Sequence, residues 1–323
     1  MRVGLVGLGR IGRFHAQTLS GVTDELVVAD ADAALAEAVA AEVGARVGDP
    51  WTADAVVVAT PTATHADLLL QACELRLPVF CEKPAAPTVA ETRRVAEAAE
   101  RTGTLVHIGF QRRFDAGFAA ARDAVLSGEL GELHRAHLVT FDPSPPPPAY
   151  VPVSGGIFRD CHIHDFDILR WVTGREADTV YATGANRGDA YFAEADDVDT
   201  SAAVITMTDG TLVTLQGSRY NGAGYDVRME LGGTLRTWAV GLGERAPLTL
   251  AEAGSAPADP WPDFQTRFAP AYEAEITAFL SAARGERESP CTVRDALAAL
   301  YLAEAADLSR HAGRPVRLQE VAK

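Results

Sequence analysis

The spacing of apolar residues changes its character near Asp115. Before that residue, short β-branched runs alternate with alanine-rich stretches whose apolar residues recur at helical spacing. The expected strands are Val3–Val6, Leu26–Ala29, Val56–Ala59, Val79–Cys81 and Leu105–Ile108, and the expected helices are Ile11–Leu19, Ala33–Val43, His65–Leu75 and Val89–Arg101. Strands that are apolar throughout and alternate with helices predict a parallel sheet covered on both faces.

After Asp115, apolar and polar residues often alternate one by one, which is typical of strands with one exposed face. The expected strands are Leu133–Phe141, Thr179–Thr183, Thr200–Thr208, Leu212–Ser218 and Val227–Leu231, with a hairpin turn at Asp209-Gly210. Helices are expected at Phe118–Leu126 and Arg159–Val172, and two more close the chain. Because helices rarely separate these strands, we expect an α/β chain whose second part is α+β, with a largely antiparallel, open sheet.

Three glycines, Gly7, Gly9 and Gly12, lie between the first strand and the first helix. In this position the pattern is typical of a Rossmann domain, where glycine permits the tight turn, the approach of a pyrophosphate and close packing of helix on strand. We therefore expect a dinucleotide-binding domain at residues 1–117 and a substrate-binding and oligomerisation domain at residues 118–323. The open sheet needs its outer face covered, which favours a homo-oligomer.

Asp30 ends the second strand. A carboxylate in that place binds ribose hydroxyls and repels a 2′-phosphate, which favours NAD over NADP. Asp30 and Asp32 are also both suitable helix caps, so the pattern alone leaves this assignment open. Thr60-Pro61 follows the third strand at the same edge of the sheet, where it either passes beneath the cofactor or only starts the next helix.

Two further motifs carry candidate catalytic residues. Lys83, in Glu82-Lys83-Pro84, ends a buried strand and is suited to hold a hydroxyl oxygen, although the tripeptide alone favours a surface lysine paired with Glu82. Asp160 and His164 are four residues apart, so on one helix the carboxylate can support a histidine that removes a proton. The alternative is a capping aspartate with an incidental histidine. His162 and His164 diverge on a helix, so no metal is expected there.

Composition excludes several classes of function. The 29 basic and 44 acidic residues give a net charge of −15, which disfavours a nucleic-acid partner. No apolar run is long enough to span a membrane, and no signal peptide is expected at the N-terminus. The four cysteines are widely spaced, which favours buried thiols in a reducing cytoplasm over disulfides or a zinc knuckle.

These motifs, together with Gly7–Ala16, Gly109–Asp115, Asp142–Pro147, Val153–Asp167 and Gly224–Arg228, resemble those of the Gfo/Idh/MocA oxidoreductases, in particular the inositol 2-dehydrogenase branch. The resemblance implies that His164 is the base, Asp160 its partner and Lys83 the residue that positions the substrate hydroxyl. It also implies that Arg112 and Tyr225 lie near the substrate. The expected contacts with NAD are Gly7, Gly9, Arg10, Ile11, Gly12, Asp30, Thr60, Pro61, His65, Glu82 and Lys83.

The chain departs from that branch in its expected substrate pocket. Pro152 replaces a lysine, Phe141 an arginine, His162 a threonine and Gln111 an asparagine that are usual there. The loss of donors changes specificity strongly, so we expect a cyclic polyol or sugar as the substrate class, and the sequence does not identify myo-inositol as the particular substrate. The alternatives are another sugar dehydrogenase or keto-sugar reductase of the family, a non-catalytic NAD-binding redox regulator, and a metal-dependent hydrolase.

Overall fold

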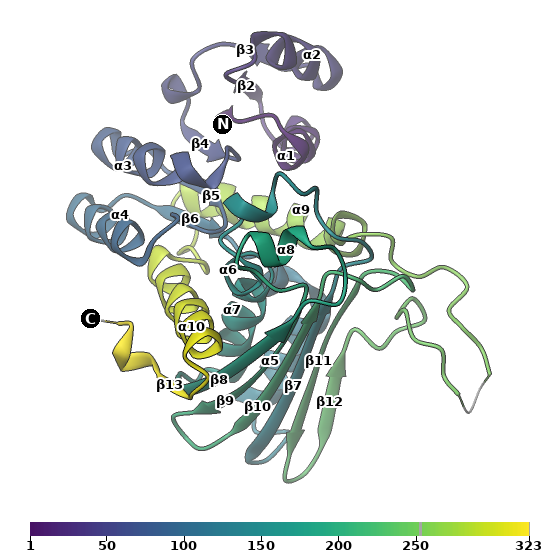
Figure 1. Cartoon of the computed structure of the whole chain (residues 1–323). Coiled ribbons are helices and arrows are strands. Elements are labelled where there is room, and N and C mark those ends of the chain that lie inside the picture. Colours follow the sequence, from purple (N-terminus) through teal and green to yellow (C-terminus); the bar gives the residue numbers. More distant parts are fainter. Residues whose placement is uncertain (252–253, 323) are drawn as a thin grey trace. The chain divides into compact units, whose positions relative to one another are not determined.

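The computed structural model describes residues 1–251 and 254–322. The chain forms two compact units whose elements are labelled in Figure 1. Unit 1 contains Met1–Gln111 and Tyr272–Ala298, and unit 2 contains Arg112–Ala271 and Ala299–Lys323. Across the described residues, no helix has the length and apolar character that crossing a membrane requires.

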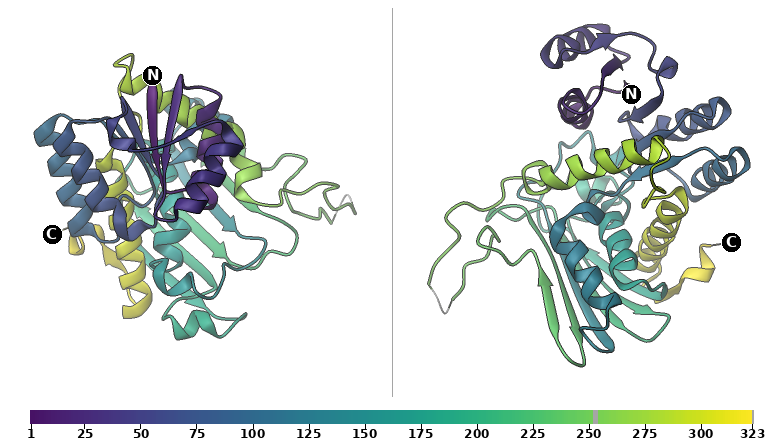
Figure 2. Two further views of the ribbon diagram at one scale, coloured as in Figure 1. Left: turned by 90° about the horizontal axis from the view of Figure 1, so that it is seen from above. Right: turned by 180° about the vertical axis from the view of Figure 1, so that it is seen from behind.

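Unit 1 is built on a parallel sheet of six strands in the order β3-β2-β1-β4-β5-β6. The strands are β1 (Arg2–Val6), β2 (Glu25–Ala29), β3 (Arg46–Val47), β4 (Ala55–Val58), β5 (Val79–Glu82) and β6 (Val106–Gly109). The helices between them are α1 (Arg10–Ser20), α2 (Ala33–Val43), α3 (His65–Leu75) and α4 (Val89–Thr102). The expected strands and helices of this part are confirmed, and the order is that of a Rossmann fold. Figure 2 shows β1 and β2 (purple) side by side in its left view.

Part of the C-terminal region belongs to the core of unit 1. Helix α9 (Phe264–Ala283) packs Ile276, Phe279 and Leu280 against apolar residues of the parallel sheet, α1 and α2. These three side chains are almost completely buried. The apolar stripe of this helix therefore stabilises the unit that precedes it in the chain, which explains why residues 272–298 group with unit 1. The boundary expected at residue 117 stays a prediction for the folding domains.

Unit 2 contains a sheet of seven strands in the order β12-β11-β7-β10-β9-β8-β13. The strands are β7 (Leu133–Phe141), β8 (Ala177–Ala185), β9 (Thr200–Met207), β10 (Leu212–Ser218), β11 (Asp226–Gly233), β12 (Thr237–Val240) and β13 (Val316–Arg317). Neighbouring strands are antiparallel except β10 and β7, which are parallel. This confirms the largely antiparallel sheet, and Gly210, with a φ of 89°, lies in the expected turn between β9 and β10.

Helices cover one face of this sheet. Helices α5 (Ala116–Leu126) and α7 (His162–Thr173) pack together against it, as the right view of Figure 2 shows. The last turns of α10 (Val293–Ala312) also contact the sheet, since the backbone N–H of Ala182 donates to Ser309 Oγ at 2.9 Å. The short helix α8 (Tyr191–Glu194) follows β8. Side chains on the opposite face alternate with the buried ones and remain exposed, so that this face of the sheet is open.

The helix expected over Arg159–Val172 is divided in two. Helix α6 (Ile157–Asp160) ends at Asp160, and α7 begins at His162. Cys161 between them keeps right-handed helical angles, so the interruption is local. The backbone N–H of His164 therefore donates to the carbonyl of Cys161, at 3.3 Å, rather than four residues back. Asp160 and His162 flank the interruption, and each is held by side-chain contacts with residues distant in sequence.

Candidate active site

The turn between β1 and α1 contains two glycines that the fold requires. Gly7 has a φ of 88°, which favours glycine strongly. A Cβ on Gly12 would lie 1.9 Å from the carbonyl oxygen of Gly7, so any larger residue there would separate helix and strand. A Cβ on Gly9 would meet no atom within 4 Å. Gly9 therefore borders open space, and the packing of the chain itself does not explain its missing side chain.

Helix α1 begins at this open space. Gly9 is its N-cap residue and Arg10 and Ile11 form its first turn, so no side chain caps the first backbone N–H groups. Uncapped N–H groups and the positive end of the helix dipole bind anions such as a pyrophosphate. The turn thus fits a dinucleotide in shape, because Gly9 leaves room for it. It also fits in charge, because the positive end of α1 attracts the pyrophosphate.

The two aspartates after β2 have different roles. Asp32 is the N-cap of α2, because its carboxylate accepts hydrogen bonds from the backbone of Ala34 and Leu35. The carboxylate of Asp30 instead accepts hydrogen bonds from the backbone N–H of Leu8, at 2.6 Å, and of Asp32, at 2.9 Å. Asp30 is therefore fixed against the glycine turn, which is where a ribose-binding carboxylate is expected.

His65 joins the loops that follow β4 and β5. Its side chain is buried, with Nε2 2.8 Å from the carbonyl oxygen of Thr60 and Nδ1 2.8 Å from that of Pro84. Thr60 Oγ also lies 2.7 Å from Thr64 Oγ, so Thr60 supports the turn that leads into α3. Thr60 and Pro61 are nevertheless at the carboxyl end of the sheet, and both expected roles remain compatible with this position.

Lys83 directly follows β5, as expected, and its peptide bond to Pro84 is cis. The neighbouring Glu82 is held from α1, because Nε2 of the fully buried His15 lies 2.6 Å from Glu82 Oε1. Glu82 thus has a partner inside unit 1 and is anchored to the helix that starts at the glycine turn. The backbone that presents Lys83 is fixed on both sides, by His15 through Glu82 and by His65 through Pro84.

In unit 2, two side chains distant in sequence hold Asp160. Arg219, which follows β10, donates to Asp160 Oδ2 at 2.8 Å, and the Tyr150 hydroxyl donates to Oδ1 at 3.0 Å. Arg219 also donates to Asp142 Oδ2 at 3.1 Å, so one guanidinium joins two carboxylates. His164 lies one turn further on, in the first turn of α7. The sequence motif contains Asp160 and His164, but nothing in it identifies Arg219 or Tyr150.

Burial and charge together set the ionisation of this group. Burial raises the pKa of Asp142, and the Arg219 charge opposes the rise. Burial alone would lower the pKa of Arg219, but Cys161, Asp160 and Asp142 raise it well above its ordinary value. Burial also raises the pKa of Tyr150, and the negative charge of Asp160 raises it further, which keeps the hydroxyl protonated as a donor.

Arg112 is buried and lies in a second polar group of unit 2. Its guanidinium donates to Asp165 Oδ1 at 2.5 Å and to Thr140 Oγ at 3.1 Å. His162 completes this group, with Nδ1 2.8 Å from Asp165 Oδ2 and Nε2 2.7 Å from Ser201 Oγ. Burial would raise the pKa of Asp165, but Arg112 and His162 lower it below its ordinary value. Arg112 thus links α7, through Asp165, to strand β7, through Thr140.

These contacts also settle the interpretation of His162. Both of its ring nitrogens are used within the protein, and the side chain is fully buried, whereas His164 is only partly buried. Among the residues described, no metal-ligand group includes His162 or His164. The pair therefore gives no support to a metal-dependent hydrolase. Tyr225, the other expected substrate neighbour, is also buried, and burial raises its pKa while the Arg112 charge lowers it.

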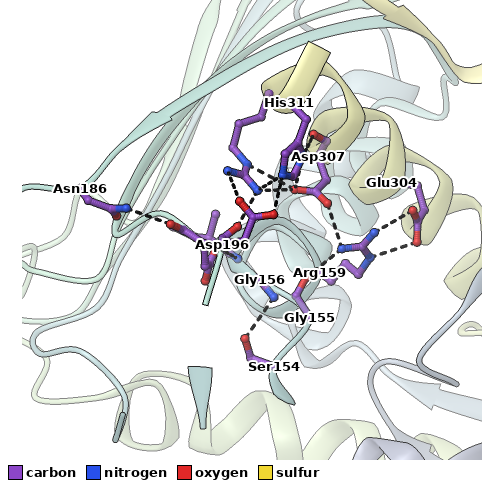
Figure 3. A network of polar contacts seen from close by, with 12 residues as sticks. Ser154, Gly155, Gly156, Arg159, Asn186, Asp196, Glu304, Asp307 and His311 are labelled. Atoms are coloured by element: carbon purple, nitrogen blue, oxygen red, sulfur yellow. Dashed lines mark hydrogen bonds and ion pairs between the residues drawn. The ribbon is translucent and has the colours of Figure 1, made fainter. Parts of the chain in front are cut away.

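Helix α6 is anchored to α10 and to the residues before β9. Gly156 has a φ of 84°, and the next backbone N–H, of Ile157, donates to Asp197 Oδ1 at 3.0 Å. Arg159 forms an ion pair with Glu304 and a second with Asp307, at 2.7 and 3.2 Å (Figure 3). These contacts, all within unit 2, fix the helix that ends in Asp160.

Two family models match the chain. The model described as an oxidoreductase family with an NAD-binding Rossmann fold matches residues 1–110, and the Gfo/Idh/MocA C-terminal domain matches residues 118–238. Fold, glycine turn and family models together define an NAD-dependent oxidoreductase. The chain belongs to the Gfo/Idh/MocA family. The predicted family, cofactor and class of dehydrogenase acting on CH–OH groups are thereby confirmed.

Known relatives match almost the whole chain. Myo-inositol dehydrogenase Hyg17 of Streptomyces leeuwenhoekii is 39% identical over 329 residues, which cover 97% of this chain and 98% of the relative. The crystal structure of a myo-inositol dehydrogenase from Corynebacterium glutamicum has a TM-score of 0.89 at 34% identity, with 98% of each chain covered. That of scyllo-inositol dehydrogenase from Lactobacillus casei with NAD(H) and scyllo-inositol has a TM-score of 0.88 at 26% identity, with 99% of each chain covered.

Proposed function

We propose that this protein oxidises a secondary hydroxyl of a cyclic polyol or sugar to a ketone, with NAD as hydride acceptor. The observation that carries the proposal is the similarity along nearly the whole chain to enzymes named for inositol oxidation. The position of Asp30 against the glycine turn supports NAD over NADP, because its charge repels a 2′-phosphate.

When bound, NAD takes up the hydride of the carbinol carbon. We propose that the contacts with NAD are those expected from the sequence: Gly7, Gly9, Arg10, Ile11, Gly12, Asp30, Thr60, Pro61, His65, Glu82 and Lys83. Lys83 holds the substrate oxygen and stabilises the charge that develops on it. His164 accepts the hydroxyl proton, and Asp160, held in place by Arg219, stabilises the imidazolium.

The substrate contacts proposed are Lys83, Asp160, His164, Arg112 and Tyr225. The buried contacts of Arg112 with Asp165 and Thr140 support an indirect role, in which Arg112 orients neighbouring groups. His162, which replaces a usual threonine, contacts Asp165 and Ser201, so its effect on specificity is also indirect. Pro152 and Phe141 lack the donors of the residues they replace, which favours a substrate with fewer hydroxyls in reach than myo-inositol offers.

The test is NADH formation from a panel of inositols and aldoses, with reduction of keto sugars by NADH as the reverse assay. We expect turnover of at least one cyclic polyol or sugar, and a loss of about 100-fold or more in kcat for Lys83→Met and His164→Ala. The Lys323→Met variant, which changes the other lysine of the sequence, serves as the control. Tight NAD binding with no turnover of any panel member would instead favour a redox regulator, and a Lys83→Met enzyme as active as the parent would refute the lysine's role.

We further propose that the protein is a cytoplasmic homo-oligomer, a tetramer or a dimer. The cytoplasm is supported by the four cysteines, all of which are free thiols. Association is supported by the open face of the unit 2 sheet, where Tyr181, Val204 and Leu212 are exposed by 42%, 47% and 55%.

A further inference from the structure

Unit 1 contains a buried cluster of three reactive side chains. The cluster lies at the β6 edge of the parallel sheet. His107 lies on the edge strand β6, Glu275 on α9 and Cys291 two residues before α10. All three have an exposed fraction of 0%. One ligand atom from each lies within 4.8 Å of the other two, and His107 Nε2 is 3.9 Å from Glu275 Oε1. Imidazole, carboxylate and thiolate are the ligands that zinc prefers in proteins.

Ser289 fixes the orientation of the His107 ring. Ser289 Oγ lies 3.1 Å from His107 Nδ1 and donates to the carbonyl oxygen of Cys291 at 3.2 Å. A serine hydroxyl has a single proton, and Ser289 donates it to the Cys291 carbonyl. In the contact with His107, Ser289 Oγ therefore accepts a hydrogen bond from Nδ1–H. Neutral His107 then has its lone pair on Nε2, on the side of Glu275. Metal-binding histidines are held in this way, with the other ring nitrogen donating to an oxygen.

The distances suit one bridging ion. A separation of 3.9 Å between Nε2 and Oε1 exceeds hydrogen-bond length. Two atoms bonded to zinc at roughly 2.0–2.2 Å in a tetrahedron lie roughly 3.3–3.6 Å apart, so the 3.9 Å between Nε2 and Oε1 has to close by only a few tenths of an ångström. The sulfur, bonded at about 2.3 Å, would lie about 3.6 Å from the other two ligand atoms in a tetrahedron, so from a separation of up to 4.8 Å the Cys291 side chain moves inward by up to about 1 Å.

The charges also balance. A thiolate, a carboxylate and a neutral imidazole neutralise one divalent cation, so binding leaves no uncompensated charge in the buried cluster. A thiolate and an imidazole in the ligand set select zinc over magnesium or calcium. The three residues are far apart in sequence, so spacing alone predicts no metal site here.

We propose that His107, Glu275 and Cys291 bind one structural Zn²⁺ in unit 1. The ion joins β6 to the segment Tyr272–Ala298, whose Cys291 carbonyl already accepts a hydrogen bond from Ile108 at 3.0 Å. A water molecule completes the tetrahedron. The site has no exposed surface, so zinc is bound during folding and takes no part in catalysis.

Metal analysis of the full-length protein tests this proposal. We expect about one zinc per chain after refolding in zinc and removal of free metal, and less than about 0.1 per chain for Cys291→Ser and His107→Gln. The matched control is Cys73→Ser, which changes another buried thiol of unit 1 and retains the zinc. Cobalt in place of zinc should give a thiolate-to-cobalt charge-transfer band that Cys291→Ser lacks.

The parent protein decides the result even if a buried variant fails to fold. A refolded parent with less than about 0.1 zinc per chain and no thiolate-to-cobalt band would overturn the proposal. Zinc that is retained in Cys291→Ser would place the ion elsewhere and overturn it as well. Neither outcome bears on the dehydrogenase activity, which is measured separately.

Discussion

Gly9 and Gly12 lie three residues apart in the same turn, yet they lead to opposite predictions. A Cβ on Gly12 would overlap the Gly7 carbonyl oxygen, whereas a Cβ on Gly9 meets open space. Gly12→Ala should therefore destabilise the protein by about 1–3 kcal/mol or more, because the helix and strand cannot relax far. Gly9→Val should fold with nearly the parent's Tm, since its φ of −59° is one that L residues adopt, but lose NAD affinity by about 10-fold or more.

Thermal unfolding and NADH binding by fluorescence separate the two effects. Gly21→Ala, at the end of α1, is the control for a glycine whose Cβ makes only an ordinary contact. A Gly9→Val protein that binds NADH as tightly as the parent would show that the open space beside Gly9 is not where the dinucleotide lies.

Arg219 compensates two carboxylates at once, and its exposed side-chain fraction is only 4%. Arg219→Met would leave Asp142 and Asp160 buried near each other without their cation, which typically costs about 3–5 kcal/mol. The pKa of Asp142 should rise further, because the charge that opposes the effect of burial is gone. We expect kcat to fall about 10-fold or more and to depend more steeply on pH, because Asp160 loses the cation that holds it.

The measurement is the pH profile of kcat together with the Tm. Arg219→Lys keeps one charge but only one of the two contacts, so it should recover part of kcat. Arg314→Met, which removes an exposed ion pair with Glu320, is the control. If Arg219→Met lowers the Tm but leaves the pH profile of kcat unchanged, the arginine is structural and has no part in positioning Asp160.

At the scale of elements, the end of α10 carries a histidine whose charge depends on its surroundings. His311 lies in the last turn, with Nδ1 2.9 Å from the Asp307 carbonyl oxygen and Nε2 3.0 Å from Asp196 Oδ2 (Figure 3). The backbone contact first, and then Asp196, raise the pKa of His311 above its ordinary value of 6.5. The negative end of the helix dipole acts in the same direction.

Because the folded-state pKa is raised, His311 stabilises unit 2 fully below pH 6.5 and progressively less as pH rises through the folded value. NMR titration should place the His311 transition above 6.5, and Asp196→Asn should lower it. The control Asp67→Asn changes an exposed carboxylate of unit 1 and should leave the titration unchanged. A His311 that titrates at or below 6.5 in the parent would contradict the arrangement at this helix end.

Local signals predicted most elements. Thr88 and Glu91, spaced as a capping box requires, form one at the start of α4, and Gly103 ends that helix with a φ of 68°. The two-residue strands β3 and β13 went unpredicted, because so short a segment has no readable periodicity. The division between α6 and α7 also went unpredicted, since residues distant in sequence anchor Asp160 and His162.

In the candidate site too, residues with a local signal could be predicted and residues placed by distant contacts could not. Asp30, Lys83 and the Asp160–His164 pair could be found from the sequence because each adjoins a recognisable strand end or helix. Arg219 and Tyr150 could not, because their role depends on contacts across unit 2. The His107 cluster could not be predicted for the same reason. Its members come together only because the segment Tyr272–Ala298 packs beside the β6 edge of the parallel sheet.

For the molecule as a whole, a net charge of −15 opposes association between copies unless the contact surface is nearly uncharged. The strand registers place Tyr181, Val204, Thr214, His137 and Glu230 in one row across the open face of the unit 2 sheet. Only one member of this row is acidic. The row is therefore a surface on which two copies can meet without strong repulsion.

Placing an acid within that row should break the proposed oligomer. Val204→Glu adds one negative charge per copy to a contact that repeats by symmetry. The added carboxylates would either repel each other or be desolvated, and both effects weaken association. We expect the parent to elute as a dimer or tetramer by size exclusion with light scattering, and Val204→Glu to elute mainly as a smaller species. Leu308→Glu, with a similar exposure of 40% but on α10, is the matched control and should keep the parent's mass. A parent that is monomeric at micromolar concentration would show that the open face stays exposed to solvent, and a Val204→Glu variant that keeps the parent's mass would place the interface elsewhere.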